Sequence, residues 1–279
     1  MGRVEHMMSE NTNVLKETIR DAEVDPRWDL TISIVSYYNK KDIENFLDSF
    51  YVLVSPSLRK HVFIINNSTD AIQDLESKYQ DLSVLQMSKN LGFGAGHNAV
   101  LNKIDSRYHA IVNPDIIYAK DAFSDLVQYM DESADVGMTA PLICGEDGHI
   151  QKVYRRQLTV FDLMVRYCFP KLLRKRLNYH TMQDVPLDKP FVCDFVQGSF
   201  LLIRSHLFQQ LCGFDERYFM YAEDADLCRR VNAISKVTVY PQTHVVHKWK
   251  KESHCSWKLL KIHAKSLIAY FHKWGWKIV

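Results

Sequence analysis

Thr31-Ile32-Ser33-Ile34-Val35-Ser36 is a run of β-branched and small residues that predicts a buried β-strand. Apolar residues at the helical spacing i, i+3, i+4, i+7 and i+11 come next, and they are Ile43, Phe46, Leu47, Phe50 and Val54. This spacing places them on one helix face, which indicates an amphipathic helix packed on the strand. The chain therefore opens its ordered part with one strand–helix unit.

The same alternation continues along the first half of the chain. Further strands are expected at residues 61–65, 82–87 and 108–112, and further helices at 70–79, 95–104 and 121–130. Four such units in a row require parallel strands joined by right-handed crossovers, so we expect a Rossmann-like α/β layer. Ligands of such sheets bind beyond the carboxyl ends of the strands, and functional residues should follow each strand.

The alternation is looser beyond about residue 136. Strands are expected at 138–143, 150–154, 193–203 and 236–240, and helices at 160–177, 222–232 and 256–276. A chain of 279 residues suits one large α/β domain or two small ones. Its first seven residues are typical of a cloning remnant and are left out of the fold prediction.

Composition excludes several classes of protein. Hydrophobic residues make up 47% of the chain and charged residues 24%, which excludes wholesale disorder. No apolar run approaches the roughly 18 residues of a membrane-spanning helix, and no signal peptide is recognisable. The six cysteines form no CxxC pair, which argues against a zinc ribbon or disulfide scaffold and favours reduced thiols in a cytoplasmic protein.

The net charge of +2 conceals an uneven distribution. Residues 155–176 carry seven basic side chains and one acidic one, and residues 241–279 carry eight lysines and one glutamate. The rest of the chain must then carry a net charge of −11. An acidic body with two cationic segments has an electrostatic consequence for its partners.

Polar residues and glycines follow the first four predicted strands. In Asn113-Pro114-Asp115 the carboxylate comes just after a buried strand and is held by a proline of fixed φ, which suits a hard-cation ligand. An ordinary turn is the alternative, and for this tripeptide alone it is the more frequent one. The third strand is followed by Asn90-Leu91-Gly92-Phe93-Gly94-Ala95-Gly96-His97-Asn98. Its glycines would let backbone amides approach a phosphate, or serve only a tight bend.

An aromatic and acidic block spans residues 213–230. The aromatic residues should wall a pocket, and the acidic cluster should open a helix. Asp224 and Asp226 are about 200° apart around a helix and cannot face one site. The helix dipole favours the charged form of Asp224, as a general base requires, although helix stabilisation alone is an equal alternative. Asp226 precedes Arg230 by four residues, which predicts a surface ion pair.

His244 and His247 follow the predicted strand 236–240. The HxxH spacing lacks the glutamate of zincins, which excludes that class of metalloprotease. One of these histidines could complete a carboxylate-based metal site, and a structural histidine is the more frequent alternative.

Taken together, these motifs resemble the inverting nucleotide-sugar glycosyltransferases of family 2, which have the GT-A fold. The resemblance covers roughly residues 30–247. Residues 90–98 resemble the family's NLGFxxGxN segment, Asn113-Pro114-Asp115 its variant of the DxD motif, and residues 213–230 its GFDExFFxYxEDxDLxxR block. The combination looks most like the rhamnosyltransferase branch, which builds bacterial cell-surface polysaccharides such as O-antigen and capsule.

The resemblance implies a set of site residues. Asp224 would be the catalytic base, and Asp115, helped by His247, would hold a divalent cation, Mg²⁺ or Mn²⁺. The acceptor side would comprise Gly198, Ser199, Tyr221 and Glu223. The nucleotide sugar would contact Ser36, Tyr38, Asn39, Asn66, Asn67, Asn90, Gly92, Phe93, Gly94, Asn98 and Asn113.

Two positions depart from the family's pattern. The family usually has Asp-Asn after the second strand, where the carboxylate reaches the nucleobase, and this chain has Asn66-Asn67. The residues after His247, Lys248-Trp249-Lys250-Lys251, lack the small glycines common there.

The resemblance also implies a reaction and its partners. We expect transfer of L-rhamnose from dTDP-rhamnose, or of a UDP-hexose unit as the alternative, to a saccharide acceptor that is lipid-linked. We expect a GT-A domain at 29–247 between a lead-in at 1–28 and a basic helical extension at 248–279. A non-catalytic nucleotide- or polysaccharide-binding module is the rival function; a dinucleotide oxidoreductase is disfavoured by the glycine spacing, and no nucleic-acid partner is expected.

The basic extension predicts a location. Lys258, Lys261, Lys265, Trp257, Trp274 and Trp276 suit a helix that lies on an anionic membrane surface. The protein would then be peripheral on the cytoplasmic face of the cell membrane. A solvated basic helix or a homodimer contact are the alternatives.

Overall fold

The computed structural model describes residues 25–248 and 257–278. Within these residues the main sheet has nine strands, in the order β3-β2-β1-β4-β10-β6-β11-β5 with β8 beside β11. Its strands are β1 (Trp28–Ser36), β2 (Lys60–Asn66), β3 (Leu82–Gln86), β4 (Ser106–Val112), β5 (Ile116–Ile117), β6 (Val136–Cys144), β8 (Phe191–Val192), β10 (Phe200–Arg204) and β11 (Lys236–His247).

The first half of this sheet is the predicted parallel layer. Strands β3, β2, β1 and β4 are neighbours and all run parallel. The second half is mixed, because β10 runs antiparallel to both β4 and β6 while β11 runs parallel to β6. The helices that surround the sheet are α2 (Lys40–Leu53), α3 (Leu75–Lys78), α4 (Gly94–Asn98), α5 (Ala122–Glu132), α6 (Val160–Cys168), α7 (Arg174–His180), α8 (Ser205–Gln210), α9 (Glu223–Asn232) and α10 (Trp257–Trp274).

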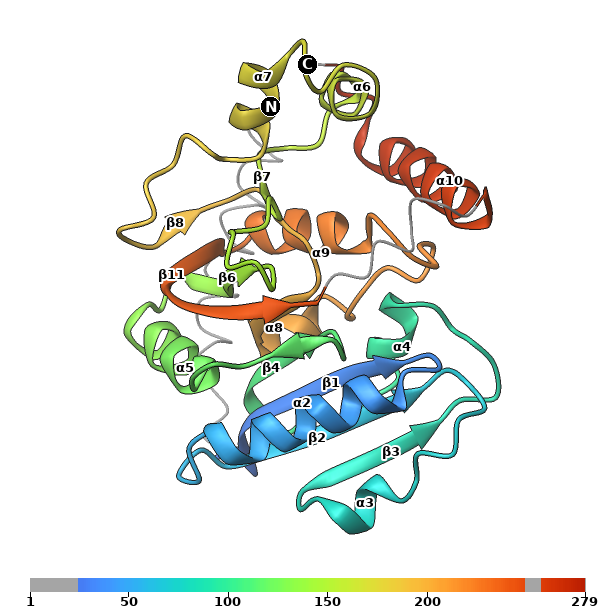
Figure 1. The fold of residues 1–279 in the computed structure, drawn as a ribbon, viewed down its shortest axis with the longest axis vertical. Helices are drawn as coiled ribbons and strands as arrows, with labels where there is room; N and C mark the ends of the chain where they lie inside the picture. The colour runs from blue at the N-terminus through green and yellow to red at the C-terminus, as the bar shows by residue number, and fades with distance from the viewer. Residues whose placement is uncertain (1–24, 249–256, 279) are drawn as a thin grey trace, which may run out of the picture.

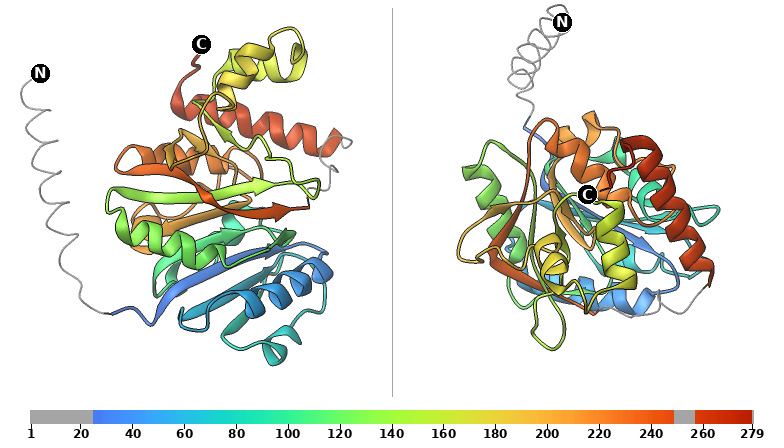
Figure 2. Two further views of the ribbon diagram at one scale, coloured as in Figure 1. Left: turned by 60° about the vertical axis from the view of Figure 1, so that its left-hand side comes forward. Right: turned by 90° about the horizontal axis from the view of Figure 1, so that it is seen from above.

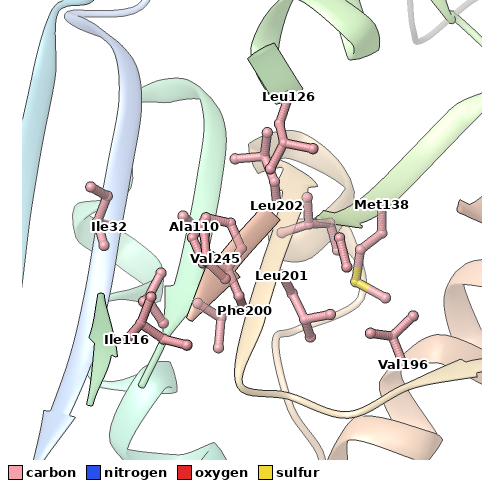
Figure 3. Close-up of a cluster of buried hydrophobic side chains, with 14 of the residues drawn as sticks. Ile32, Ala110, Ile116, Leu126, Met138, Val196, Phe200, Leu201, Leu202 and Val245 are labelled. Carbon is pink, nitrogen blue, oxygen red and sulfur yellow. The ribbon is translucent and has the colours of Figure 1, made fainter. Parts of the chain in front are cut away.

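The core forms where the sheet meets the amphipathic helices. Ile43, Phe46, Leu47 and Phe50 are the buried face of α2, as their spacing predicts. Aliphatic side chains from the strands and from α5 meet in the centre, among them Ile32, Ala110, Ile116, Leu126, Met138, Leu201 and Leu202 (Figure 3). All of these side chains are fully or almost fully buried.

Two predicted helices of the first half are much shorter than expected. Residues 70–79 contain only α3, because side chains take the carbonyl groups that a longer helix would use: Asn66 Nδ2 donates to Asp70 O and Lys40 Nζ to Ala71 O. The helix expected at 95–104 is split into α4 and a 3₁₀ turn at Leu101–Lys103. Two glycines in α4 weaken it, since glycine costs up to about 1 kcal/mol in a helix.

Predicted elements of the second half are interrupted. The helix expected at 160–177 is two helices, α6 and α7, with Pro170 in the break, where it lacks the amide hydrogen that a helix needs. The strand expected at 193–203 is β9 (Phe195–Val196) and β10, separated by a bend, and that expected at 150–154 is only β7 (Tyr154–Arg155). Strands β7 and β9 pair as a separate small sheet.

Strand β11 is longer than the sequence predicts. It passes an irregularity between Tyr240 and His244 and continues to His247, where the prediction ended it at residue 240. The bend lets the chain resume pairing with β6 and with β5. His247 therefore lies on a strand end beside β5, which follows Asp115 closely.

Helix α10 packs on the body of the protein. Figures 1 and 2 show it beside α6 and α9, at the opposite end of the molecule from α2 and α3. Ser266, Tyr270 and Phe271 are buried, and the carbonyl groups of Lys277 and Ile278 accept hydrogen bonds from the first residues of α6. No helix in the described part of the chain is long and apolar enough to cross a membrane.

Candidate active site

A cavity of about 620 Å³ lies between α6, α9 and α10. It brings together residues from distant parts of the sequence, and seven of those predicted to form the site line it: Phe93, Asn113, Gly198, Ser199, Tyr221, Glu223 and Asp224. Asn113 directly follows β4, and Gly198 and Ser199 form the bend between β9 and β10. The four predicted acceptor-side residues and the predicted base thus share one wall with two of the predicted nucleotide-binding residues.

Asp224 is held in this wall by backbone hydrogen bonds. The amide of Gly198 donates to its Oδ2 at 3.0 Å, and the amide of Ala225 donates to its Oδ1 at 2.8 Å. A side chain at Gly198 would be crowded, since a Cβ there would lie 3.3 Å from Phe93 and 3.4 Å from Asp224. The bend that interrupts the predicted strand 193–203 therefore directs the amide of Gly198 toward the Asp224 carboxylate.

Glu223 is the second carboxyl group of the cavity. It is buried, and its Oε2 has no hydrogen-bond partner in the described structure. Burial and the adjacent Asp224 raise the pKa of Glu223 well above its ordinary value. Burial also raises the pKa of Asp224, but the Gly198 and Ala225 amides and the positive charge of Arg155 oppose this. These contacts favour the negative charge of the pair on Asp224 rather than on Glu223.

The backbone just before α9 is strained. Tyr221 and Ala222 have φ values of 72° and 67°, a left-handed conformation that residues with a side chain rarely adopt. The turn ends at the first helical hydrogen bond, from Asp226 N to Ala222 O at 2.9 Å. Tyr221 thereby lines the cavity, where its ring lies 4.7 Å from that of His263 on α10. Such strain is typically found at functional sites.

Asp115 and His247, the predicted metal ligands, are in contact. Asp115 Oδ1 lies 3.2 Å from His247 Nε2, and His247 Nδ1 lies 3.3 Å from Gln151 Oε1, which can orient the ring. One carboxylate and one imidazole suit Mn²⁺ or Mg²⁺ when phosphate oxygens supply further ligands. Within the described residues no group of three or more His, Cys, Asp or Glu side chains could hold a metal by itself. His244 is exposed.

Several predicted nucleotide-binding residues lie outside the cavity lining and bond to the protein. The side chain of Asn66 uses both its donors, to Asp70 O and Gln86 Oε1, and its oxygen accepts from Ser68. Asn67 donates to Gly92 O at 2.9 Å. Asn98 pairs with both backbone polar groups of Phe214. These asparagines fix the turns after β2 and β3.

The other predicted nucleotide-binding residues lie at the end of β1 and in the loops that follow β1 and β3. The hydroxyl of Ser36 donates to Asn39 Oδ1 at 2.9 Å, and the amide of Gly92 donates to Asn90 Oδ1 at 2.8 Å. Tyr38 is 58% exposed at a φ of 55°; its hydroxyl lies 3.2 Å from Thr69 Oγ1, and its ring lies 4.8 Å from that of Tyr37.

The glycines of residues 92–96 are packed against protein. A Cβ on Gly92, whose φ is 85°, would lie 2.1 Å from Phe219 O, and one on Gly94 would lie 2.9 Å from Phe214. The tight-bend alternative accounts for both positions, since neither leaves room for a side chain. The loop after β3 thus packs closely against the aromatic and acidic block, at Phe214 and Phe219.

The predicted surface position of Asp226 is wrong. Its side chain is fully buried and bonds to Arg230 Nε at 2.8 Å, Lys273 Nζ at 2.6 Å and Trp274 Nε1 at 2.7 Å. The i, i+4 pair with Arg230 is present as predicted, but α10 covers it. The sequence of α9 alone contains no sign of this covering helix.

Sequence reasoning missed part of the cavity. Arg155 and Arg166 line it, as do Gln197 and the α10 residues Trp257, Leu259, Leu260, His263 and Leu267. The cationic stretch 155–176 was a signal for the arginines. Nothing in the sequence predicted that α10 lines the cavity, because α10 and α6 are about 100 residues apart along the chain.

Comparison with known proteins shows a consistent likeness. The model of the family "Glycosyl transferase family 2" matches residues 31–209. An N-acetylglucosaminyl-diphospho-decaprenol L-rhamnosyltransferase of Mycobacterium tuberculosis is 26% identical over 78% of this chain and 75% of its own. Rhamnosyltransferase WbbL of Escherichia coli K12 is 26% identical over 64% of this chain and 69% of its own.

Solved structures share the fold. A mannosyltransferase of Pyrobaculum calidifontis in complex with GDP-Man and Mn²⁺ has a TM-score of 0.60 at 17% identity, over 94% of this chain and 70% of its own. The structure of GalNAc-T7 with UDP, GalNAc and Mn²⁺ has a TM-score of 0.62 at 14% identity over 81% of this chain. The chain spans 44% of the length of the latter.

Proposed function

The chain belongs to glycosyl transferase family 2 and has the GT-A fold, and we propose that its cavity transfers a sugar from a nucleotide sugar to a saccharide hydroxyl with inversion. The observation that carries this proposal is Asp224, a buried carboxylate fixed by the Gly198 amide in the cavity wall. A positioned carboxylate that keeps its charge is what a general base requires.

The reaction balances around that carboxylate. The acceptor oxygen forms a bond to the anomeric carbon while the bond from that carbon to the diphosphate oxygen breaks. Asp224 Oδ takes the hydroxyl proton, and the electron pair of the broken bond leaves with the nucleoside diphosphate. The raised pKa of Glu223 favours its neutral form, which does not compete for this proton. Leu163, Leu260 and Leu267 form an apolar part of the cavity lining.

Asp115 and His247 would hold a divalent cation near the leaving diphosphate. When bound, such a cation supplies positive charge against the negative charge that grows there. The support in this chain is the contact of the two ligands and the orientation of His247 by Gln151. The Mn²⁺ in two solved structures of the same fold is consistent with this choice.

The donor and the acceptor follow from the relatives. Two curated relatives are rhamnosyltransferases, which supports dTDP-rhamnose as the donor, and one is named for a decaprenol-diphosphate saccharide acceptor. We extend both to this chain, with cell-surface polysaccharide synthesis as the setting. The apolar side of the cavity, formed by α6 and α10, suits an acceptor that carries a lipid.

A lipid-linked acceptor requires the enzyme at a membrane surface. Lys258, Lys261 and Lys265 are exposed on α10, as are Trp257 at its start and Trp276 after its end, and this surface suits the cytoplasmic face of the membrane. Trp274, predicted for the same surface, bonds to Asp226 instead. We retain residues 29–247 as the catalytic domain, with α10 completing its cavity. Residues 1–24 of the predicted lead-in at 1–28, and residues 249–256 and 279 of the extension, lie outside the described residues.

A panel of nucleotide sugars tests the proposal. With Mg²⁺ or Mn²⁺ present, we expect one donor, dTDP-rhamnose first, to release its nucleoside diphosphate. Asp115→Ala should abolish turnover, because the cation loses its carboxylate ligand, and it should leave the melting temperature nearly unchanged. Activity that persists in a chelator, or in Asp115→Ala, would contradict the metal assignment.

A further inference from the structure

Two arginines in the cavity make no direct ion pair in the described part of the chain, although the charges of Arg155 and Asp224 interact at longer range. Arg155 is 7% exposed and Arg166 is half-buried, and no hydrogen bond or ion pair joins either guanidinium group to another described residue. Their contacts are to aromatic rings: Arg155 lies 5.1 Å from the ring of Phe195, and Arg166 lies 5.5 Å from that of Tyr167. A buried charge without a partner is costly.

These arginines differ from the other arginines of the same cationic stretch. Arg156 is paired with Asp184, and Arg176 with the buried Asp162. Arg155 and Arg166 instead repel each other. Burial, together with the positive charge of Arg166, lowers the pKa of Arg155 to about 9. At pH 7 both remain positively charged, so the cavity presents two cations close together. An anion with two or more charges would stabilise this arrangement.

The position of the pair limits which anion fits. Arg155, Arg166 and Gln197 line the cavity of Asp224 and also a second cavity, of about 640 Å³, that reaches His247. The pair therefore lies between the base and the proposed cation site. On the Asp224 side it is followed by an apolar wall that consists of Leu158, Leu163, Leu259, Leu260 and Leu267.

We propose that Arg155 and Arg166 form a diphosphate-binding subsite for the lipid-linked acceptor, whose apolar chain runs along the leucine wall between α6 and α10. This inference rests on the proposed function, which already uses the cation side for the donor diphosphate. Each arginine binds phosphate oxygens through a planar fork of donors. Held there, the acceptor places its saccharide toward Asp224.

The test uses farnesyl diphosphate as the probe, and isothermal titration of the full chain measures its binding. The titration is run with excess dTDP or UDP and Mg²⁺, so that the donor site is filled. We expect farnesyl diphosphate to bind, and Arg166→Gln to weaken this binding at least about 10-fold, the usual loss for a charge-assisted hydrogen bond. Arg155→Gln should act in the same direction. Arg174→Gln is the matched control, because Arg174 is exposed on α7 outside the cavity and should leave the affinity unchanged.

Other outcomes would overturn the proposal. Farnesol that binds as tightly as farnesyl diphosphate would show an apolar groove alone. If the probe bound only in the absence of dTDP, and if dTDP itself bound more weakly to both arginine variants, the pair would serve the donor diphosphate. An unchanged affinity in Arg166→Gln would also overturn it, and this variant decides the matter if Arg155→Gln does not fold.

The same experiment separates this subsite from the proposed function. If no nucleotide sugar is turned over while arginine-dependent binding of farnesyl diphosphate persists, the proposed function fails and the subsite stands. If a nucleotide sugar is turned over and the arginine variants bind the probe normally, the function stands and the subsite fails.

Discussion

Asp224 and Asp226 are the same residue type on two faces of α9, and their surroundings are opposite. Asp224 faces the cavity, where backbone amides hold it and no described side chain bonds to it. Asp226, two residues further, is enclosed by Arg230, Lys273 and Trp274. The first carboxylate keeps its oxygens available for a ligand, and the second has its charge satisfied by the protein. The comparison teaches that partners, rather than residue type, separate a candidate catalytic group from a structural one.

The buried face also explains why α10 lies where it does. Lys273 bonds to Asp215 as well as Asp226, and the Trp274 ring lies 4.5 Å from the guanidinium of Arg229. Lys273 and Arg217 hold the pKa of Asp215 far below its usual range. These contacts fix the C-terminal end of α10, whose N-terminal part, at Leu260 and His263, lines the cavity. The contacts of Asp226 with α10 thus help to position the α10 side chains that line the cavity of Asp224.

The largest expected effect on folding separates the two aspartates. Asp226→Asn should lower the free energy of unfolding by about 3 kcal/mol, because it removes the counter-charge of Arg230 and one of the two carboxylates that bond to Lys273, which keeps Asp215. Asp224→Asn should lower it less than Asp226→Asn does: its single amide oxygen can accept from only one of the two backbone amides, but the substitution separates no ion pair and removes a buried charge. Urea denaturation at pH 7 measures both values. Equal losses in the two variants would break the comparison.

A smaller effect concerns Glu223 and pH. Its pKa is raised in the folded protein, so between its unfolded and folded values the folded state binds the extra proton and stability falls as pH rises. Glu223→Gln cannot ionise, and it should be more stable than the wild type at pH 7–8, by a margin that grows by at most about 1.4 kcal/mol per pH unit. The margin should vanish near pH 4. A margin that does not change with pH would contradict the raised pKa.

The smallest effect on folding is expected at the exposed face of α10. Replacing Lys258, Lys261 and Lys265 with Gln should change the free energy of unfolding by less than about 0.5 kcal/mol, because these lysines have no described partner. The same variant should bind vesicles of anionic lipid more weakly, by about 1 kcal/mol for each lysine. Salt should release the wild type from such vesicles. Vesicle binding that is insensitive to both salt and the substitutions would exclude the electrostatic attachment.

The sequence predicted the parts of the molecule that local pattern controls. The four parallel strands, the buried face of α2 and the divergence of Asp224 from Asp226 follow from periodicity alone. The length of the helix at 70–79 could not be predicted, because Asn66 and Lys40, which lie outside it, donate to its backbone carbonyl groups. The glycines that weaken α4 at 95–104 are, by contrast, visible in the sequence. Arg155 and His263 in the cavity, and α10 over Asp226, depend on contacts between residues remote in sequence.

The turnover of Asp224→Asn and Asp226→Asn, compared under identical conditions, tests the central claim most directly. Release of nucleoside diphosphate from the best donor in the panel, measured with saturating donor and acceptor, gives kcat for each variant. The account predicts a loss of at least about 10²-fold for Asp224→Asn, which cannot accept the acceptor's proton, with a melting temperature near that of the wild type. Asp226→Asn should retain most of its kcat below its lowered melting temperature. A folded Asp224→Asn that turns over like the wild type would contradict the account.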